Sequence, residues 1–391
     1  MMQIVIVGGG YAGVACAARL AHRARVQRTP VRIRLINPKP VLVERIRLHQ
    51  AAAGQQLPER RLDRLLGRCG IELVSGYAEA LDPAARTLRV GEQTLGWDQL
   101  VLALGSMPDV NAVPGVAAHA FTLAPESVPA LHARLAALPD GARVAVVGGG
   151  LTGIESASEI ADAFPRLRVQ LVAHGVIGPD FGPAGRRYLL DTLARRFGIA
   201  LHEHVRVDAV GATRLETGQG PLAFDLCVWA AGFALPALAR QAGLRTNARG
   251  QVLVDPQLRS LSHPWIYAAG DLAAPALPPG QELPMGCKTA MPMGVHVGDN
   301  LARELIGQEG SAFDYALLFY CVSLGRRDGI VPWADAEGRL TGRVLTGRRA
   351  AWFKEMICRS TWWGLVLEAR GHRAVVWKHT GHASQSLAAA G

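Results

Sequence analysis

The chain has 391 residues, of which 49% are hydrophobic and 19% charged, enough for two or three domains of roughly 150 residues. This composition excludes intrinsic disorder as the main state. The longest uncharged apolar stretch, residues 226–239, has 14 residues, fewer than the about 20 that a membrane span needs. The net charge of +10 includes only four lysines, and no zinc-finger or RNP pattern accompanies it, so we expect no nucleic-acid partner.

The six cysteines stand apart, with no CxxC or CxxxxC pair. This spacing argues against a zinc site, an iron–sulfur cluster or a redox-active dithiol formed locally, and we predict no metal. The first twenty residues lack the basic segment of a secretion signal. We therefore expect a cytoplasmic protein with reduced thiols.

The N-terminal segment predicts a strand, a glycine turn, a helix and a second strand. Residues 3–7 form a β-branched run, the turn Gly-Gly-Gly-Tyr-Ala-Gly follows at 8–13, an alanine-rich stretch reaches residue 24, and a buried-looking strand occupies 31–36. Such a succession is a parallel βαβ unit.

The same pattern returns about 140 residues later. Residues 143–147 form the strand, the turn Gly-Gly-Gly-Leu-Thr-Gly occupies 148–153, a helix reaches about residue 163, and a strand covers 169–173. In a GxGxxG turn the first glycine permits the tight turn, the second admits a pyrophosphate, and the third lets the helix pack on the strand. The helix N-terminus then attracts the phosphates. Two such turns predict two bound dinucleotides.

Three further apolar strands end in small residues. Residues 100–104 lead to Gly105, residues 226–231 lead to Gly232, and residues 265–269 lead to Gly270 and Asp271. The last of these presents a carboxylate at a strand end.

With these features the chain resembles the FAD-dependent pyridine nucleotide–disulfide oxidoreductase superfamily. Within it, the closest resemblance is to the type II NADH dehydrogenases, which also lack the dithiol and keep a turn like the one at 148–155. Residues 284–290 resemble their segment beneath the flavin pyrimidine. The resemblance covers residues 1–310 well and the last eighty loosely.

The resemblance implies an α/β fold of two Rossmann-like three-layer dinucleotide-binding domains, with the NAD domain inserted in the FAD domain, plus a C-terminal α+β region. The expected limits are 1–112 and 246–310 for the two parts of the FAD domain, 113–245 for the NAD(P)H domain, and 311–391 for the C-terminal region.

It also implies that the first turn binds FAD, that the second binds NAD(P)H, and that Asp271 reaches the ribityl–phosphate region of the flavin. Asn37 stands where an acid usually binds the FAD ribose, to which an amide can still hydrogen-bond. The candidate cofactor-binding residues are Gly8, Gly10, Tyr11, Ala12, Gly13, Asn37, Lys39, Arg45, Ala78, Ala103, Gly105, Gly148, Gly150, Gly153, Glu155, Gly232, Gly270, Asp271, Lys288, Thr289 and Ala290.

Three residues are candidates for catalysis. Glu155 either faces the nicotinamide or merely favours the dipole of its helix. Lys288 either adds charge beside the flavin or is an exposed lysine, while a helix beginning near Thr289 would turn the amides of Thr289 and Ala290 toward the flavin N1/O2 edge. His296 is a candidate residue in the wall of the acceptor pocket.

The segment 44–50 matches the loop-helix that lies beside the flavin in the resembled family. It makes Arg45, His49 and Gln50 candidate pocket residues, with a solvated helix face as the alternative.

Two departures from the family pattern bear on substrates. Ala173, followed by His174, stands where an acid would select NADH over NADPH, so the preference is left open. The paired glutamines of quinone-reducing relatives are missing between residues 281 and 308, where Met291, Pro292, Met293 and His296 stand.

The C-terminal region gathers aromatic and basic residues. Ten of 23 aromatics lie from Phe313 onward, and the residues from Tyr320 to the end carry +6 of the net charge. Residues 323–329 predict a turn between strands. Residues 350–368 predict an amphipathic helix that could lie on the cytoplasmic face of a membrane, cover the flavin, or form a dimer interface.

These features together predict an FAD-dependent NAD(P)H oxidoreductase that passes electrons to a quinone-like or other small acceptor. Two alternatives stay open: a flavin-dependent tailoring oxidoreductase with one specific metabolite as substrate, and a redox-sensing nucleotide-binding protein.

Overall fold

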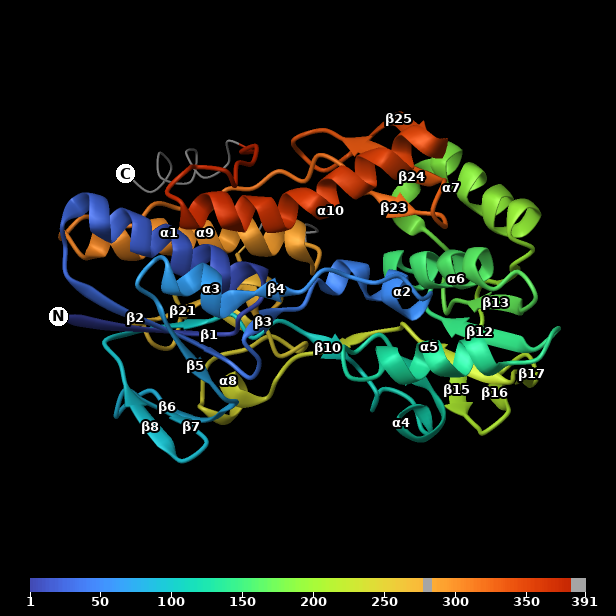
Figure 1. Ribbon diagram of the computed structural model, residues 1–391, viewed down its shortest axis with the longest axis horizontal. Helices are drawn as coiled ribbons and strands as arrows, with labels where there is room; N and C mark the ends of the chain where they lie inside the picture. Colours follow the sequence, from blue (N-terminus) through green and yellow to red (C-terminus); the bar gives the residue numbers. More distant parts are fainter. Residues whose placement is uncertain (277–282, 381–391) are drawn as a thin grey trace.

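The computed structural model describes residues 1–276 and 283–380, and within them two five-stranded parallel sheets lie side by side (Figure 1). The first sheet has the order β21-β9-β1-β2-β5. Its strands are β1 (Met2–Val7), β2 (Val31–Asn37), β5 (Glu72–Ser75), β9 (Gln99–Leu102) and β21 (Ile266–Ala268). Parallel strands covered on both faces become continuous apolar runs, as in the buried residues 4–7 of β1.

Helices α1 (Tyr11–Gln27) and α9 (Cys287–Glu304) pack closely together on one face of the first sheet, and α3 (Leu62–Gly67) lies beside them (Figure 1). The meander β6 (Ala78–Asp82), β7 (Thr87–Val90) and β8 (Gln93–Gly96) lies on the other side. Close helix contact is possible because small residues line it: a Cβ atom on Gly294 of α9 would overlap the carbonyl oxygen of Ala12 in α1.

The second sheet has the order β11-β18-β12-β13-β14. Its strands are β11 (Phe121–Thr122), β12 (Arg143–Val147), β13 (Arg168–Val172), β14 (Ala200–His202) and β18 (Leu226–Trp229). One core joins this sheet to α5 (Val128–Ala137) and α6 (Leu151–Ala163). A separate core on the other face joins it to α4 (Val116–His119) and the meander β15 (Val207–Val210), β16 (Arg214–Thr217) and β17 (Leu222–Ala223).

The chain builds β1 to β9 of the first sheet, then the whole second sheet, and returns to the first sheet with β21 and α9. The second domain is therefore inserted in the first, and the predicted fold class of two Rossmann-like domains is confirmed. The limit predicted at residue 112 falls between β10 (Met107–Pro108) and α4, and the one at residue 245 between α8 (Leu238–Gln241) and β20 (Val252–Val254). These exact limits stay predictions.

The C-terminal region joins the two domains. Strands β23 (Val322–Ser323), β24 (Gly329–Ala334) and β25 (Leu340–Thr346) form a small antiparallel sheet above α6 and α7 (Gly182–Asp191), and α10 (Gly347–Ala369) runs back along α1 (Figure 1). The predicted turn at 323–329 and the predicted helix at 350–368 are both confirmed, the helix being slightly longer.

Helix α10 buries part of its aromatic content and exposes the rest. Phe353 packs edge-on against Phe319 and Trp333, with ring centroids 5.2 and 5.7 Å away. The outer face carries Trp352, Met356 and Trp363, which are 66%, 44% and 55% exposed. None of the helices in the described residues is long and apolar enough to cross a membrane.

Candidate active site

The first glycine turn forms an open cradle at the end of β1. A Cβ atom on Gly8, whose φ is +115°, would overlap the carbonyl oxygen of Ala103, and one on Gly13 would overlap that of Gly8. Nothing lies within 4 Å of a Cβ placed on Gly10. Because Gly10 caps α1 without a side-chain hydrogen bond, the first amides of α1 face an open space in which an anion can bind.

The second turn repeats this geometry at the end of β12. A Cβ on Gly148 would lie 2.8 Å from the backbone of Ala230, one on Gly153 would overlap the carbonyl oxygen of Gly148, and one on Gly150 would meet nothing within 4 Å. Gly150 also caps α6 without a side-chain bond. Two open helix N-termini on two sheets fit the pyrophosphates of two dinucleotides.

Asn37 supports the first turn. Its Oδ1 accepts a hydrogen bond of 2.9 Å from the amide of Gly9, and its Nδ2 donates one of 2.7 Å to the carbonyl of Lys39. Asn37 pairs with Ser75 on the neighbouring strand, and Ala78 begins β6 three residues later. These residues therefore share the edge of the sheet beside the cradle.

Asp271 links the end of the first sheet to α9. Its carboxylate accepts hydrogen bonds of 2.7 Å from the Ser106 hydroxyl and 2.9 Å from the amide of Gly286, while Arg45 donates to the carbonyl of Ser106. Gly105 precedes Ser106, and a Cβ on Gly270 would lie 3.2 Å from that of Ala12 and 3.4 Å from that of Ala290. The structure thus brings together most of the residues predicted to bind the first dinucleotide.

Helix α9 begins at Cys287, two residues before the predicted start. As a result the amides of Thr289 and Ala290 already donate to the carbonyl of Gly286, over 3.3 and 3.0 Å. These two amides are thus engaged within the first turn of α9, and their contact with a flavin stays a prediction. In the described part of the chain, the amides of Cys287 and Lys288 are the first-turn donors without a recorded partner.

Lys288 is half-buried rather than an exposed surface lysine. Its Nζ lies 3.8 Å from the ring centroid of Tyr320, a cation–π contact. Burial lowers the pKa of Lys288 to about 8, so its amine is still mostly protonated at pH 7 but loses its proton more readily than an ordinary lysine.

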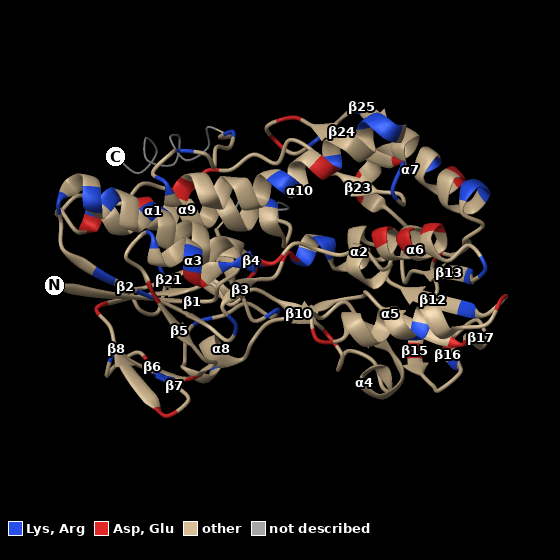
Figure 2. Cartoon of the chain, viewed as in Figure 1, with Lys and Arg blue, Asp and Glu red and all other residues tan. Residues whose placement is uncertain are grey.

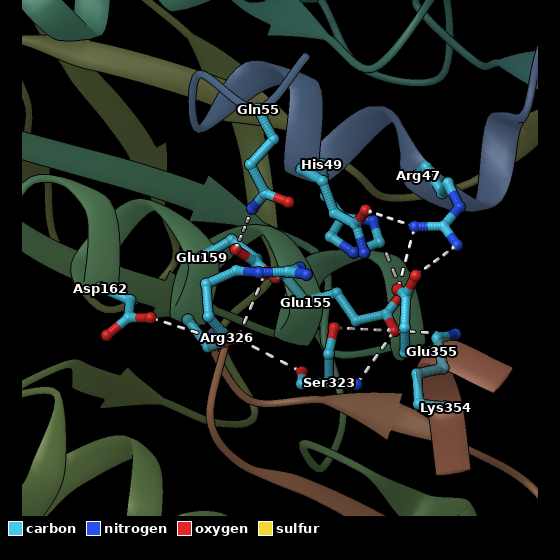
Figure 3. A network of polar contacts seen from close by, with 12 residues as sticks. Arg47, His49, Gln55, Glu155, Glu159, Asp162, Ser323, Arg326, Lys354 and Glu355 are labelled. Carbon is cyan, nitrogen blue, oxygen red and sulfur yellow. Dashed lines mark hydrogen bonds and ion pairs between the residues drawn. The ribbon is translucent and has the colours of Figure 1, made fainter. Parts of the chain in front are cut away.

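Glu155 lies at the centre of a polar cluster contributed by four elements (Figure 3). Its Oε1 is 3.0 Å from Nζ of Lys354 in α10 and accepts from the amide and hydroxyl of Ser323 over 3.1 and 3.3 Å. Its Oε2 is 3.7 Å from Nδ1 of His49 in α2 (Leu48–Ala52). Glu155, His49 and Ser323 are buried.

The charges of this cluster follow from its burial and its ion pair. Burial alone would raise the pKa of Glu155, but Lys354, His49 and the Ser323 amide outweigh it and hold that pKa below its ordinary value. Burial lowers the pKa of His49 to about 4 in spite of Glu155, whereas Glu155 raises the pKa of Lys354 against the effect of burial. At neutral pH the cluster therefore holds a carboxylate, an ammonium and a neutral imidazole.

Two outer ion pairs fix the elements around the cluster. Arg47 bonds Glu355 of α10 over 3.0 Å and Gln50 over 3.0 Å, which gives Gln50 a supporting contact. Arg326 donates to Glu159 over 3.0 Å, and burial raises the pKa of Glu159 to about 7. These pairs hold α2, α6 and the C-terminal region in one arrangement (Figure 3).

The imidazole Nε2 of His49 has no hydrogen-bond partner among the described residues, so a donor or acceptor site is left for a ligand.

His296 does not join this cluster. It is buried in α9, its Nε2 lies 3.0 Å from Nδ2 of Asn300, and its ring packs edge-on against Phe313 at 5.3 Å. This packing explains its position without a catalytic role.

Sequence reasoning missed Lys354, Ser323, Tyr320 and Ser106. Lys354 carried a weak signal, because it is one of four lysines in the chain and the other basic residues of its helix are arginines. The other three gave none.

Comparison with known proteins assigns the chain to a family. The model of the pyridine nucleotide-disulphide oxidoreductase family matches residues 2–294. The chain belongs to this family.

Its relatives include an NADH dehydrogenase-like protein of Mycobacterium tuberculosis, 30% identical over 332 residues, 79% of this chain and 82% of that protein. A type II NADH:quinone oxidoreductase of Staphylococcus haemolyticus is 25% identical over 387 residues, 91% and 94% of the two chains. The chain is therefore an oxidoreductase of the NADH dehydrogenase-like kind.

Solved structures share the fold. The sulfide:quinone oxidoreductase of Aquifex aeolicus superposes with a TM-score of 0.80 at 20% identity, covering 96% of this chain and 93% of that one. NDH2 of Plasmodium falciparum in complex with NADH gives 0.76 at 15% identity, covering 96% and 100%.

Proposed function

We propose that the protein is an FAD-dependent NAD(P)H oxidoreductase that passes electrons to a quinone-like small acceptor. The observation that carries this proposal is the pair of open, uncapped helix N-termini at Gly10 and Gly150, one on each sheet. The buried cluster around Glu155 lies where elements of both domains meet.

The residues of the first domain fit FAD, which when bound would accept a hydride and release electrons one or two at a time. The amides after Gly10 would hold its pyrophosphate. Asn37, with Lys39 and Ala78 at the same edge, would adjoin the adenosine ribose, and Asp271 with Arg45 would adjoin the ribityl chain. The amides of Cys287 and Lys288 and the Lys288 ammonium would stabilise negative charge on the reduced ring.

In the second domain, the amides after Gly150 would hold the pyrophosphate of NAD(P)H, while Gly148 and Gly153 shape the turn. Gly232 follows β18, whose residues 226–229 pair with β12 beside this turn. Glu155 starts one turn into α6 and would direct the nicotinamide end toward the first domain.

The cluster around Glu155 can move a proton. Reduction of a quinone by NAD(P)H consumes one proton overall, and the neutral His49 can take up a proton at its unpartnered Nε2 and pass it to the reduced acceptor. The neighbouring Glu155 carboxylate would stabilise the imidazolium formed, and Lys354 holds that carboxylate in place.

The choice of a quinone-like acceptor is supported by the relatives that are type II NADH:quinone oxidoreductases. Contact with a membrane surface fits the exposed Trp352, Met356 and Trp363 on the outer face of α10. Trp favours the membrane interface, and the helix also carries basic residues, drawn blue in Figure 2. A homodimer formed through this face is the competing arrangement.

A matched pair of variants tests the assignment. Gly10→Val and Gly150→Val each place a side chain in open space, so neither should disturb the fold. Gly10→Val should abolish FAD binding, because the side chain takes the pyrophosphate's place. Gly150→Val should keep FAD, lose reduction by nicotinamide nucleotides, and still be reduced by dithionite.

The measurements are the flavin absorbance of the purified protein, anaerobic reduction, and turnover with benzo- and naphthoquinones. Full flavin content in Gly10→Val would contradict the site. Absence of turnover with every quinone, despite normal flavin reduction, would point to a specific metabolite as acceptor.

A further inference from the structure

The residue that follows β13 sits where a Rossmann domain contacts the adenosine ribose. In the first domain, a Cβ on Gly9 would lie 2.6 Å from Cγ of Asn37. In the second, a Cβ on Gly149 would lie 2.7 Å from Cβ of Ala173. Ala173 therefore occupies the position equivalent to Asn37. In NAD-binding domains this position supplies the carboxylate that holds the ribose 2′-hydroxyl and repels a 2′-phosphate.

An acidic residue, Glu203, does contact the loop of residues 173–178, but its carboxylate already has hydrogen-bond partners within the protein. Glu203, directly after β14, accepts hydrogen bonds from Arg186 on both carboxylate oxygens and from the amide of Ile177. Arg186 also donates to the carbonyl of Ile177 over 3.2 Å. Glu203 thus acts as an internal brace for residues 173–178 and does not replace the missing ribose-binding acid.

Two histidines lie near the same position. The amide of Val205 donates to the carbonyl of Ala173 over 2.9 Å, and that of His204 to the carbonyl of Gly175 over 3.0 Å. This pairing places His204 beside His174, and both side chains are exposed. Imidazoles donate hydrogen bonds whether neutral or charged. They therefore suit the 2′-phosphate of NADPH better than the 2′-hydroxyl of NADH, which an acidic side chain usually binds.

We propose that the second dinucleotide site binds NADPH in preference to NADH, because Ala173 removes the repelling carboxylate and His174 and His204 offer donors to the 2′-phosphate. This inference rests on the proposed function and names its reductant.

The test compares the two oxidised nucleotides on the purified holoenzyme. Calorimetric titration should give a lower Kd for NADP⁺ than for NAD⁺, and flavin reduction should be faster with NADPH than with NADH at equal subsaturating concentration. Ala173→Glu should weaken NADP⁺ binding at least about tenfold, because it places a carboxylate beside the 2′-phosphate and like charges repel, while NAD⁺ binding stays the same or tightens.

Ala173→Gln is the matched control, since it has the same shape without the charge, and it should retain most NADP⁺ affinity. Since Ala173 is buried, the exposed His174→Asp gives a second route to the same charge without a packing cost. It should weaken NADP⁺ more than NAD⁺.

Tighter binding of NAD⁺ than of NADP⁺ by the unaltered protein would overturn the inference. So would an equal loss of both nucleotides in the glutamate and glutamine variants. A flavoprotein that binds and is reduced by NADH alone refutes only this preference, whereas one that binds neither nucleotide refutes the proposed function as well.

Discussion

Replacing Lys354 with methionine tests how the charge of the buried Glu155 is maintained. The variant keeps the length of the side chain and removes the ammonium 3.0 Å from Glu155, which is 6% exposed. A buried charge that loses its partner costs about 3–5 kcal/mol, but the carboxyl group can escape part of this cost by taking up a proton. From its ordinary pKa of 4.5, protonation at pH 7 costs about 3.4 kcal/mol.

The loss of stability should therefore be at most about 3.4 kcal/mol at pH 7 and below about 1 kcal/mol at pH 5. In the unaltered protein the folded pKa of Glu155 is lowered, so its contribution is present above the unfolded pKa and is lost as pH falls through the folded one. In the variant the Lys354 ammonium is lost, burial is opposed only by His49 and the Ser323 amide, and we expect the folded pKa to lie above the unfolded one. The proton can also settle on His49, 3.7 Å away, which leaves the pH trend unchanged.

Urea unfolding followed by tryptophan fluorescence at pH 5, 6 and 7 measures this. Arg359→Met is the control on the same helix, because Arg359 pairs with Glu355 at an exposed position and should cost under about 1 kcal/mol. Adding Glu155→Gln to Lys354→Met should restore most of the loss at pH 7. Equal losses at pH 5 and pH 7, or no recovery in the double variant, would refute the reasoning.

The remaining predictions concern the flavin and the outer face of α10. Lys288→Met should lower the flavin midpoint potential by about 30 mV, equivalent to about 1.4 kcal/mol, because a cation beside the reduced ring is lost. Equilibration with a redox dye measures this potential, and an unchanged value would show that Lys288 does not lie beside the flavin ring. Anionic liposomes should bind the protein more weakly as the salt concentration rises, and the double variant Trp352→Ser/Trp363→Ser should bind them weakly even at low salt. Sedimentation with liposomes measures both effects, and unchanged binding by the variant would mean that another surface contacts the membrane.

A feature of this fold can be predicted from the sequence when the residues that determine it are neighbours in the chain. The glycine turns were predictable because strand, turn and helix are neighbours in the chain, and Gly13 is required by its contact with Gly8 within one βαβ unit. The start of α9 was misplaced because Gly286, rather than a polar side chain, caps it. The partner of Glu155 could not be predicted, because helix periodicity identifies the buried face of α10 but not which distant residue meets Lys354.

His296 shows the same limit and leads to a prediction about acid stability. Its ring is packed against Phe313 and hydrogen-bonded to Asn300. Burial, together with the charges of Arg303 and His379 and against the hydrogen bond with the Ser311 backbone, lowers its pKa to about 4. Because the folded pKa lies below the unfolded value of 6.5, the stability linked to neutral His296 is full above pH 6.5 and is lost as pH falls toward 4.

This loss is limited to about 3.4 kcal/mol. His296→Gln removes the titration while its amide can still reach Asn300. Between pH 7 and pH 4 the unaltered protein should therefore lose up to about 3 kcal/mol more unfolding free energy than the variant, and the acid effect of His49 cancels in the comparison. Both half-reactions of the flavin should keep their rates at pH 7. Parallel pH profiles would show that His296 is not buried as a neutral ring, and a slowed oxidative half-reaction in a stable variant would return it to the acceptor site.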